Sequence, residues 1–124
     1  MAGTAPIPAE ELRAVLEPVR PWLAGEAERP PRAVLGAAVR TTARWLAQQV
    51  PGRSVELRIP PHVAVQCVEG PRHTRGTPPN VVEADPVAWV QLCAGELSWA
   101  EAAADGRVRT WGDRADLSPW LPMR

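Results

Sequence analysis

The sequence predicts an α+β fold, and two patterns carry that prediction. Apolar residues in the first part of the chain recur at the spacing of amphipathic helices, whereas those after Ser54 alternate with polar residues, as in a half-buried strand. The length of 124 residues suits a single domain. We expect this domain to comprise a helical part over residues 1–52 and a part with the sheet and short helices over residues 53–124.

The N-terminal helical pattern begins at Pro8. Its apolar positions share one helical face: Leu12, Val15, Leu16, Val19, Trp22 and Leu23. Pro18 and Pro21 interrupt this pattern, because each lacks a backbone donor and its ring clashes with the preceding turn. We therefore expect two short helical pieces with a break near Glu17.

A second, longer helix is predicted from Pro31 to Gln49. Proline suits the first turn of a helix, and the apolar stripe continues as far as Leu46. The Pro51-Gly52 pair is a typical turn signal, so it ends this helix.

Two strands are predicted after this turn. Apolar and polar residues alternate from Val55 to Ile59, which indicates a half-buried strand that ends at the Pro60-Pro61 pair. The stretch from His62 to Val68 is apolar on both faces, which favours a central strand. The segment from Gly70 to Pro79 has no period and many breakers, so we expect a long loop there.

Beyond the loop, Val81 and Val82 predict a short strand. Asp85 followed by Pro86 is a typical helix start, and Gly95 is a typical helix end. The sequence therefore predicts a third helix between these signals.

Ser98 and Glu101 match a capping box, in which the side chain of each bonds the backbone N–H of the other. This motif predicts a short helix that runs to Asp105. The stretch from Arg107 to Trp111 has strand character. A last helical segment is expected to carry three apolar residues: Ala115, Leu117 and Leu121.

Charge and composition argue against several classes of protein. Fourteen arginines balance fourteen acidic residues, so there is no basic signature for nucleic acid. No apolar run approaches the roughly 18 residues that span a bilayer, and we expect a cytoplasmic protein without stable membrane insertion. Cys67 and Cys93 would stay reduced in that compartment. Because Phe and Tyr are absent, the six tryptophans supply much of the apolar bulk.

The residues from Val81 to Leu121 follow the order of elements of a known family. A strand leads into an acidic helix start, a Trp-bearing helix, a Gly-x-Leu turn at Gly95, an Ala-rich short helix, a strand and a Gly-Asp pair at Gly112. This order resembles the C-terminal half of the sterol carrier protein (type 2) fold. The stretch from Cys67 to Glu83 is similar to the short bacterial members of that superfamily. The resemblance implies an about five-stranded mixed or antiparallel sheet, covered on one side by helices, with an apolar tunnel between the two layers.

The same resemblance implies a binder or carrier of an apolar ligand, such as a lipid, a fatty acyl chain or a sterol, without catalysis and without a cofactor. We expect six residues to form the apolar wall of its pocket: Trp89, Leu92, Trp99, Val108, Leu117 and Leu121. Ordinary core packing is the alternative for each of them. Two other functions stay open. One is a protein-interaction module with a collapsed cavity; the other is an accessory domain of a small-molecule isomerase system, because similar domains follow a metal-binding bundle in relatives of maleylpyruvate isomerase.

Polar residues of the predicted loop are further candidates for ligand contact: Arg72, His73, Thr74 and Arg75. Their donors, with glycines close by, suit an anionic head group. The alternative is a solvated loop whose arginines pair with Glu69 or Glu83.

Neither a metal site nor a catalytic site is predicted. The two His and two Cys residues form no Cys-x-x-Cys or His-x-x-x-His pair. No Gly-x-Ser-x-Gly elbow and no nucleotide-binding glycine loop occurs. One alternative stays open, in which His73 reaches Cys67 in space and activates its thiol. The sequence identifies neither the ligand nor the oligomeric state.

Overall fold

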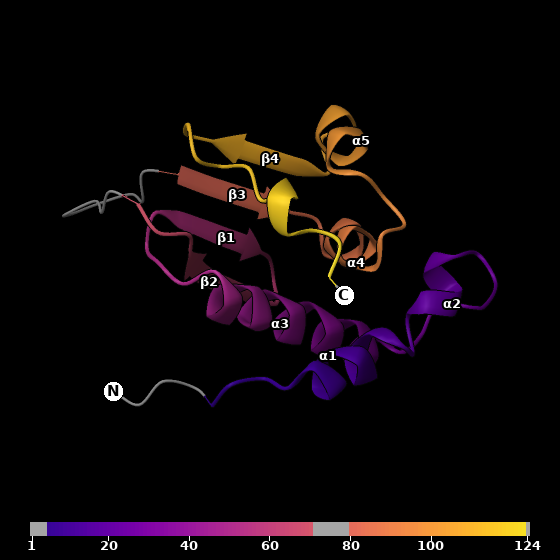
Figure 1. Ribbon diagram of the computed structural model, residues 1–124. Helices are drawn as coiled ribbons and strands as arrows, with labels where there is room; N and C mark the ends of the chain where they lie inside the picture. The colour runs from indigo at the N-terminus through magenta and orange to yellow at the C-terminus, as the bar shows by residue number, and fades with distance from the viewer. Residues whose placement is uncertain (1–4, 71–79, 124) are drawn as a thin grey trace.

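The computed structural model describes residues 5–70 and 80–123 of the chain (Figure 1). Its helices and strands follow in this order: α1 (Ala9–Leu16), α2 (Arg20–Leu23), α3 (Arg32–Gln49), β1 (Val55–Ile59), β2 (Val63–Cys67), β3 (Asn80–Ala84), α4 (Pro86–Ala94), α5 (Trp99–Ala104), β4 (Val108–Trp111) and the 3-10 turn η1 (Ser118–Trp120). The predicted α+β class is confirmed.

The strands of the described residues form one mixed sheet in the order β2–β1–β3–β4. β1 pairs with β2 antiparallel and with β3 in parallel, and β3 pairs with β4 antiparallel. The resemblance implied about five strands, and the described part of the chain contains four.

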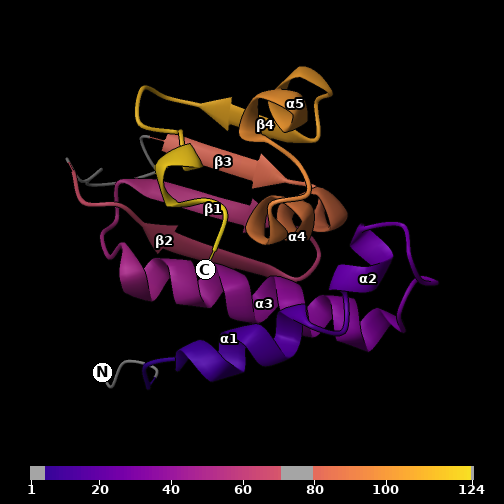
Figure 2. The same ribbon diagram turned by 45° about the vertical axis from the view of Figure 1, so that its right-hand side comes forward.

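Helices cover one face of this sheet, as the resemblance implied. α3 and α4 lie on that face, and α1 packs against α3 (Figure 2). Alternate residues of β1, from Val55 to Ile59, are fully buried beneath this layer. The opposite face carries an ion pair of 3.0 Å between Arg109 and Glu83. It also carries Trp111, whose exposed fraction is 53%.

The boundaries of the first three helices follow from prolines. α1 ends at Leu16 and α2 begins at Arg20, which confirms the predicted break near Glu17. α3 has 18 residues and ends directly before the Val50-Pro51 pair. Among the described residues, none of the helices combines the length and the apolar character that a membrane span requires.

Gly52 permits the sharp turn between α3 and β1. Its φ is +150°, and a Cβ at this position would lie 2.1 Å from the carbonyl oxygen of Val68. Only glycine avoids that clash. The close approach allows two backbone hydrogen bonds, from Ser54 N to Val68 O at 3.0 Å and from Val68 N to Val50 O at 2.8 Å.

The predicted central position of the second strand is wrong. Among the described residues β2 pairs with β1 alone, so it lies at an edge of the sheet. Ala64 and Gln66 on its outer face are exposed. The apolar character that suggested a central strand comes from Val63 and Val65, which share the covered face with their partners in β1.

The predicted helix after β4 is also wrong. Only the short turn η1 forms, because Pro119 and Pro122 lack the backbone donors that a continued helix needs. The segment instead crosses the covered face of the sheet (Figure 1). Ala115, Leu117 and Met123 are buried there and complete the core.

Candidate functional site

A groove opens at the surface where the end of α4, the start of α5 and the C-terminal segment meet. Its volume is about 420 Å³. The residues that line it are Leu92, Gly95, Glu96, Leu97, Ser98, Trp99, Glu101, Ser118, Leu121 and Pro122. Leu92 at its base is 2% exposed, whereas Leu97, Trp99 and Leu121 are half-buried. The groove therefore combines an apolar lining with a polar edge.

Gly95 shapes the wall at the end of α4. Its φ of +83° is left-handed, which L side chains rarely adopt. This conformation ends the helix, and Glu96 N donates back to Gln91 O at 2.8 Å. A Cβ on Gly95 would lie 3.6 Å from Pro122, so the turn lies directly beside the C-terminal segment.

The C-terminal segment forms the opposite wall because the core holds it at two points. Leu117 is fully buried, and Met123 is 4% exposed. The backbone N–H of Met123 also donates to Cys93 O at 2.9 Å. Leu121 lies between these two anchors and faces the groove.

A capping box fixes the polar edge at the start of α5. Ser98 Oγ accepts a hydrogen bond of 3.1 Å from Glu101 N, and Glu101 Oε1 accepts one of 3.1 Å from Ser98 N. The predicted box is thus confirmed. The backbone N–H of Ser98, together with the Ser98 side chain, holds the pKa of the exposed Glu101 carboxyl below its usual value. The edge therefore carries an ionised carboxylate at neutral pH.

The family of the chain follows from residues 31–123. They match a family model described as bacterial SCP ortholog, where SCP stands for sterol carrier protein. The chain belongs to this family. No curated protein matches it. The whole groove lies within the SCP-matched residues, whereas α1 and α2 precede them.

Three of the six predicted wall residues of this SCP-family chain meet at the groove. Leu92, Trp99 and Leu121 come from α4, α5 and the C-terminal segment and are far apart in sequence. Sequence reasoning placed Leu97 in the Gly-x-Leu turn, but it predicted neither Leu97 nor Pro122 as a wall residue. Their position next to the predicted Gly95 stop and capping box was the available signal, because those motifs fix where the chain turns.

The other three predicted wall residues lie in the core. Trp89 and Leu117 are fully buried and Val108 is 3% exposed, and none of the three lines the groove. The indole Nε1 of Trp89 donates to Thr42 Oγ1 at 2.9 Å, which fixes the ring between α4 and α3. The apolar pattern of the sequence could not separate these residues from those of the groove, because both sets are apolar and at least half-buried.

The predicted polar-loop residues Arg72, His73, Thr74 and Arg75 lie outside the described residues. Asn80, where β3 begins, is buried and firmly held. Its Nδ2 donates to Ser54 O at 2.8 Å, and its Oδ1 accepts from Arg114 N at 2.9 Å. The role of the loop residues stays a prediction.

Both cysteines are free and buried. Burial raises the pKa of the Cys67 thiol to about 11, and burial raises the pKa of Cys93 further. Both are therefore thiols at neutral pH, a poor state for a nucleophile. The pairing of Cys67 with His73 falls outside the described residues. Within residues 5–70 and 80–123, no three His, Cys, Asp or Glu side chains gather as a metal site would require.

Proposed function

We propose that this SCP-family chain binds and carries an apolar ligand, with an acyl chain or a fused ring as its buried part, and catalyses no reaction on it. The observation that supports this most is the groove formed by Leu92, Leu97, Trp99 and Leu121. Its volume of about 420 Å³ lies within the range of roughly 300–1,000 Å³ that is typical of ligand pockets.

Desolvation would supply most of the affinity. Each buried methylene contributes about 0.8 kcal/mol, so about 15 buried methylenes give micromolar binding after an association cost of about 4 kcal/mol. Trp99 and Leu121 both line the groove, so they supply aromatic and branched apolar surface for a ring or chain. The protonated state of both thiols supports a role without covalent chemistry.

The proposed ligand position differs from a tunnel between sheet and helices. Trp89, Leu117 and Val82 fill that space and are fully buried. This packing favours one alternative in part, a protein-interaction module with a collapsed interior. The groove at the edge of the helical layer favours the carrier, because it leaves apolar side chains half-buried.

The groove can be blocked without disturbing the core. Leu121 is half-buried, so Leu121→Trp should fill the groove with little loss of stability. The matched control is Trp111→Leu, which changes an exposed residue on the opposite face of the sheet. Binding of 1-decanol, measured by isothermal titration calorimetry, should weaken at least tenfold in the blocked variant and stay unchanged in the control.

Native mass spectrometry of the protein purified from its own host gives a second test. A co-purified lipid-sized molecule that is lost in Leu121→Trp supports the proposal. The proposal fails if no apolar molecule co-purifies and neither 1-decanol nor a sterol binds the parent protein at its solubility limit.

A further inference from the structure

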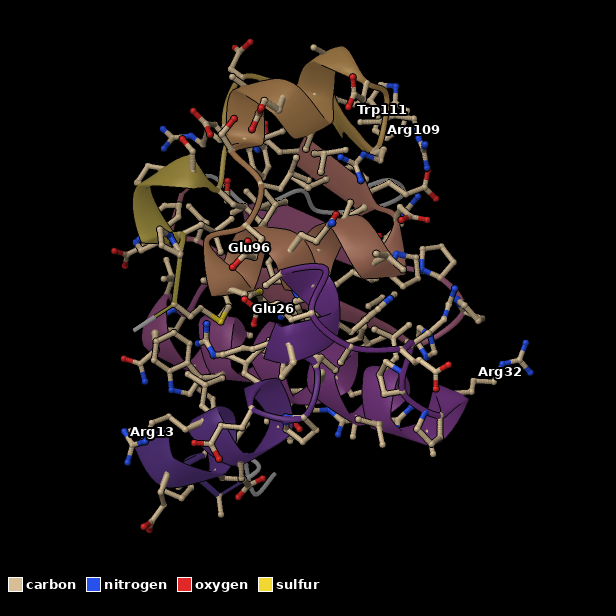
Figure 3. The ribbon with its side chains drawn as sticks, turned by 90° about the vertical axis from the view of Figure 1, so that its right-hand side faces the viewer. Arg13, Glu26, Arg32, Glu96, Arg109 and Trp111 are labelled. Atoms are coloured by element: carbon tan, nitrogen blue, oxygen red, sulfur yellow. The ribbon has the colours of Figure 1, made fainter. Side chains whose placement is uncertain are left out.

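The polar edge of the groove is acidic. Four of its lining residues have polar side chains: Glu96, Ser98, Glu101 and Ser118. Among the residues that the structure describes, no arginine or histidine lines the groove. Figure 3 shows Glu96 on the segment that joins α4 to α5, away from the labelled arginines of α1, α3 and β4. A ligand head group at this edge therefore meets carboxylates and hydroxyls.

The carboxylate of Glu101 is fixed in place and ionised. The hydrogen bond of 3.1 Å from Ser98 N holds its Oε1 at the start of α5. The same bonding lowers its pKa, so the charge is present throughout the neutral range. It also occupies the part of the edge where the free N–H groups of a helix start would otherwise attract an anion.

Among the described residues, Arg107 and Arg20 lie near the groove, and each also binds another group. Arg107 donates from Nη1 to Gln91 Oε1 at 3.0 Å, and its Nη2 lies 3.6 Å from Asp105 Oδ2. Arg20 donates to the carbonyl oxygen of Ala94 at 3.4 Å, at the end of α4. Neither lines the groove. The charge of Arg107 also acts on the Glu101 carboxyl and helps to lower its pKa, but neither arginine places a cationic group among the lining residues.

We infer that the groove selects amphiphiles with an uncharged or cationic head group and discriminates against carboxylates. This inference rests on the proposed function, since it names the class of ligand for the same groove. An alcohol or ammonium head group can donate to Glu96 or Glu101, or lie beside it, whereas a carboxylate is repelled and finds no cationic partner among the lining residues.

Three probes that differ mainly in the head group are compared: 1-decanol, decyltrimethylammonium and decanoate. The tail of decanoate is one methylene shorter, which accounts for about fourfold of its weaker binding. The dissociation constants of the three probes are measured by titration calorimetry at pH 7.5 in low salt, below the critical micelle concentrations. We expect decanoate to bind at least tenfold more weakly than 1-decanol, and decyltrimethylammonium to bind at least as tightly as 1-decanol. Added salt should narrow the difference between the two ionic probes, because the edge is exposed to solvent.

Removing the charges gives the decisive comparison. The double variant Glu96→Gln, Glu101→Gln keeps the shape of both side chains, and Gln also serves at the third position of a capping box. It should bring the dissociation constants of 1-decanol and decanoate to within about fivefold of each other, close to the difference that the shorter tail alone causes. The matched control, Glu10→Gln with Glu11→Gln, removes two exposed charges from α1 and should leave the tenfold preference intact.

The outcomes separate this inference from the proposed function. If 1-decanol binds and decanoate binds equally well, the head-group preference is overturned while the carrier function stands. If a variant with Arg72→Ala and Arg75→Ala then loses binding of decanoate but keeps binding of 1-decanol, the predicted polar loop contacts the head group. If no probe binds the parent protein, both proposals are overturned.

Discussion

The indole Nε1 of Trp89 donates a hydrogen bond of 2.9 Å to Oγ1 of Thr42, and this bond joins α4 to α3 inside the core. Thr42 Oγ1 in turn donates a hydrogen bond of 2.6 Å to Ala38 O. Both side chains are fully buried. One hydroxyl therefore satisfies the only polar atom of the largest buried side chain, and the layer that supports the groove depends on it.

Thr42→Val should destabilise the fold by about 1–3 kcal/mol, because it keeps the volume of the side chain but leaves the Trp89 N–H buried without an acceptor. Urea unfolding followed by circular dichroism measures this loss. Thr42→Ser keeps the hydroxyl and should cost about 1 kcal/mol or less, from the lost methyl group. Equal losses in the two variants would show that the hydroxyl contributes nothing.

Stability at alkaline pH should depend on the two buried cysteines. The chain contains neither Lys nor Tyr, so few other groups titrate between pH 8 and 11. The pKa of Cys67 rises from an ordinary value of 9.0 to about 11 in the folded protein. Above pH 9 the unfolded chain loses the thiol proton while the folded chain keeps it, so stability falls as pH rises. Cys67 alone should lower the free energy of unfolding by about 2 kcal/mol between pH 8 and 10.5.

The slope of the free energy of unfolding against pH, rather than its absolute value, tests this expectation. Cys67→Ala loses some packing at every pH but should flatten the decline, and Cys93→Ala should do the same. Thiol reagents should react with the parent protein at pH 8 only as fast as it opens. If the slope is unchanged in both variants, groups other than the two cysteines cause the loss of stability at alkaline pH.

Gly52→Ala should be strongly destabilising, by about 3 kcal/mol, because the added Cβ would lie 2.1 Å from the carbonyl oxygen of Val68. That oxygen belongs to the backbone, so it cannot move aside as the end of a flexible side chain could. Gly106 is the matched comparison. Its φ is +73°, but nothing lies within 4 Å of a Cβ there, so Gly106→Ala should cost only about 1 kcal/mol from the left-handed backbone. Thermal unfolding of the two variants separates a clash from a conformational preference.

Local signals in the sequence predicted the elements well. Pro18 and Pro21 placed the break between α1 and α2, Asp85 and Gly95 placed the ends of α4, and each acts through backbone chemistry within one turn. The position of β2 at an edge was not predictable in this way. Val63 and Val65 are as apolar as residues of a central strand, and only the pairing of β1 with β3 shows which strand is internal.

Only some of the groove residues were predicted, and the reason is related to that for β2. Trp89 and Trp99 have the same residue type and lie on consecutive helices, yet one fills the core and the other lines the groove. The difference arises because Gly95 turns the chain between them and Pro122 lies against that turn. Which residues meet across such a turn depends on contacts between distant segments, and no local pattern records them.

Ser98→Ala should loosen α5 and weaken ligand binding together. The change removes the oxygen that accepts from Glu101 N, and loss of such a cap costs about 0.5–2 kcal/mol. Because α5 has only six residues, we expect the loss to be local, with faster amide hydrogen exchange in α5 and little change in β1 or β3. Ser98→Thr keeps the hydroxyl and should preserve both exchange rates and affinity for 1-decanol. If Ser98→Ala loosens α5 but binds 1-decanol as tightly as the parent, then Trp99 and its helix form no part of the binding surface, and the ligand contacts α4 and the C-terminal segment alone.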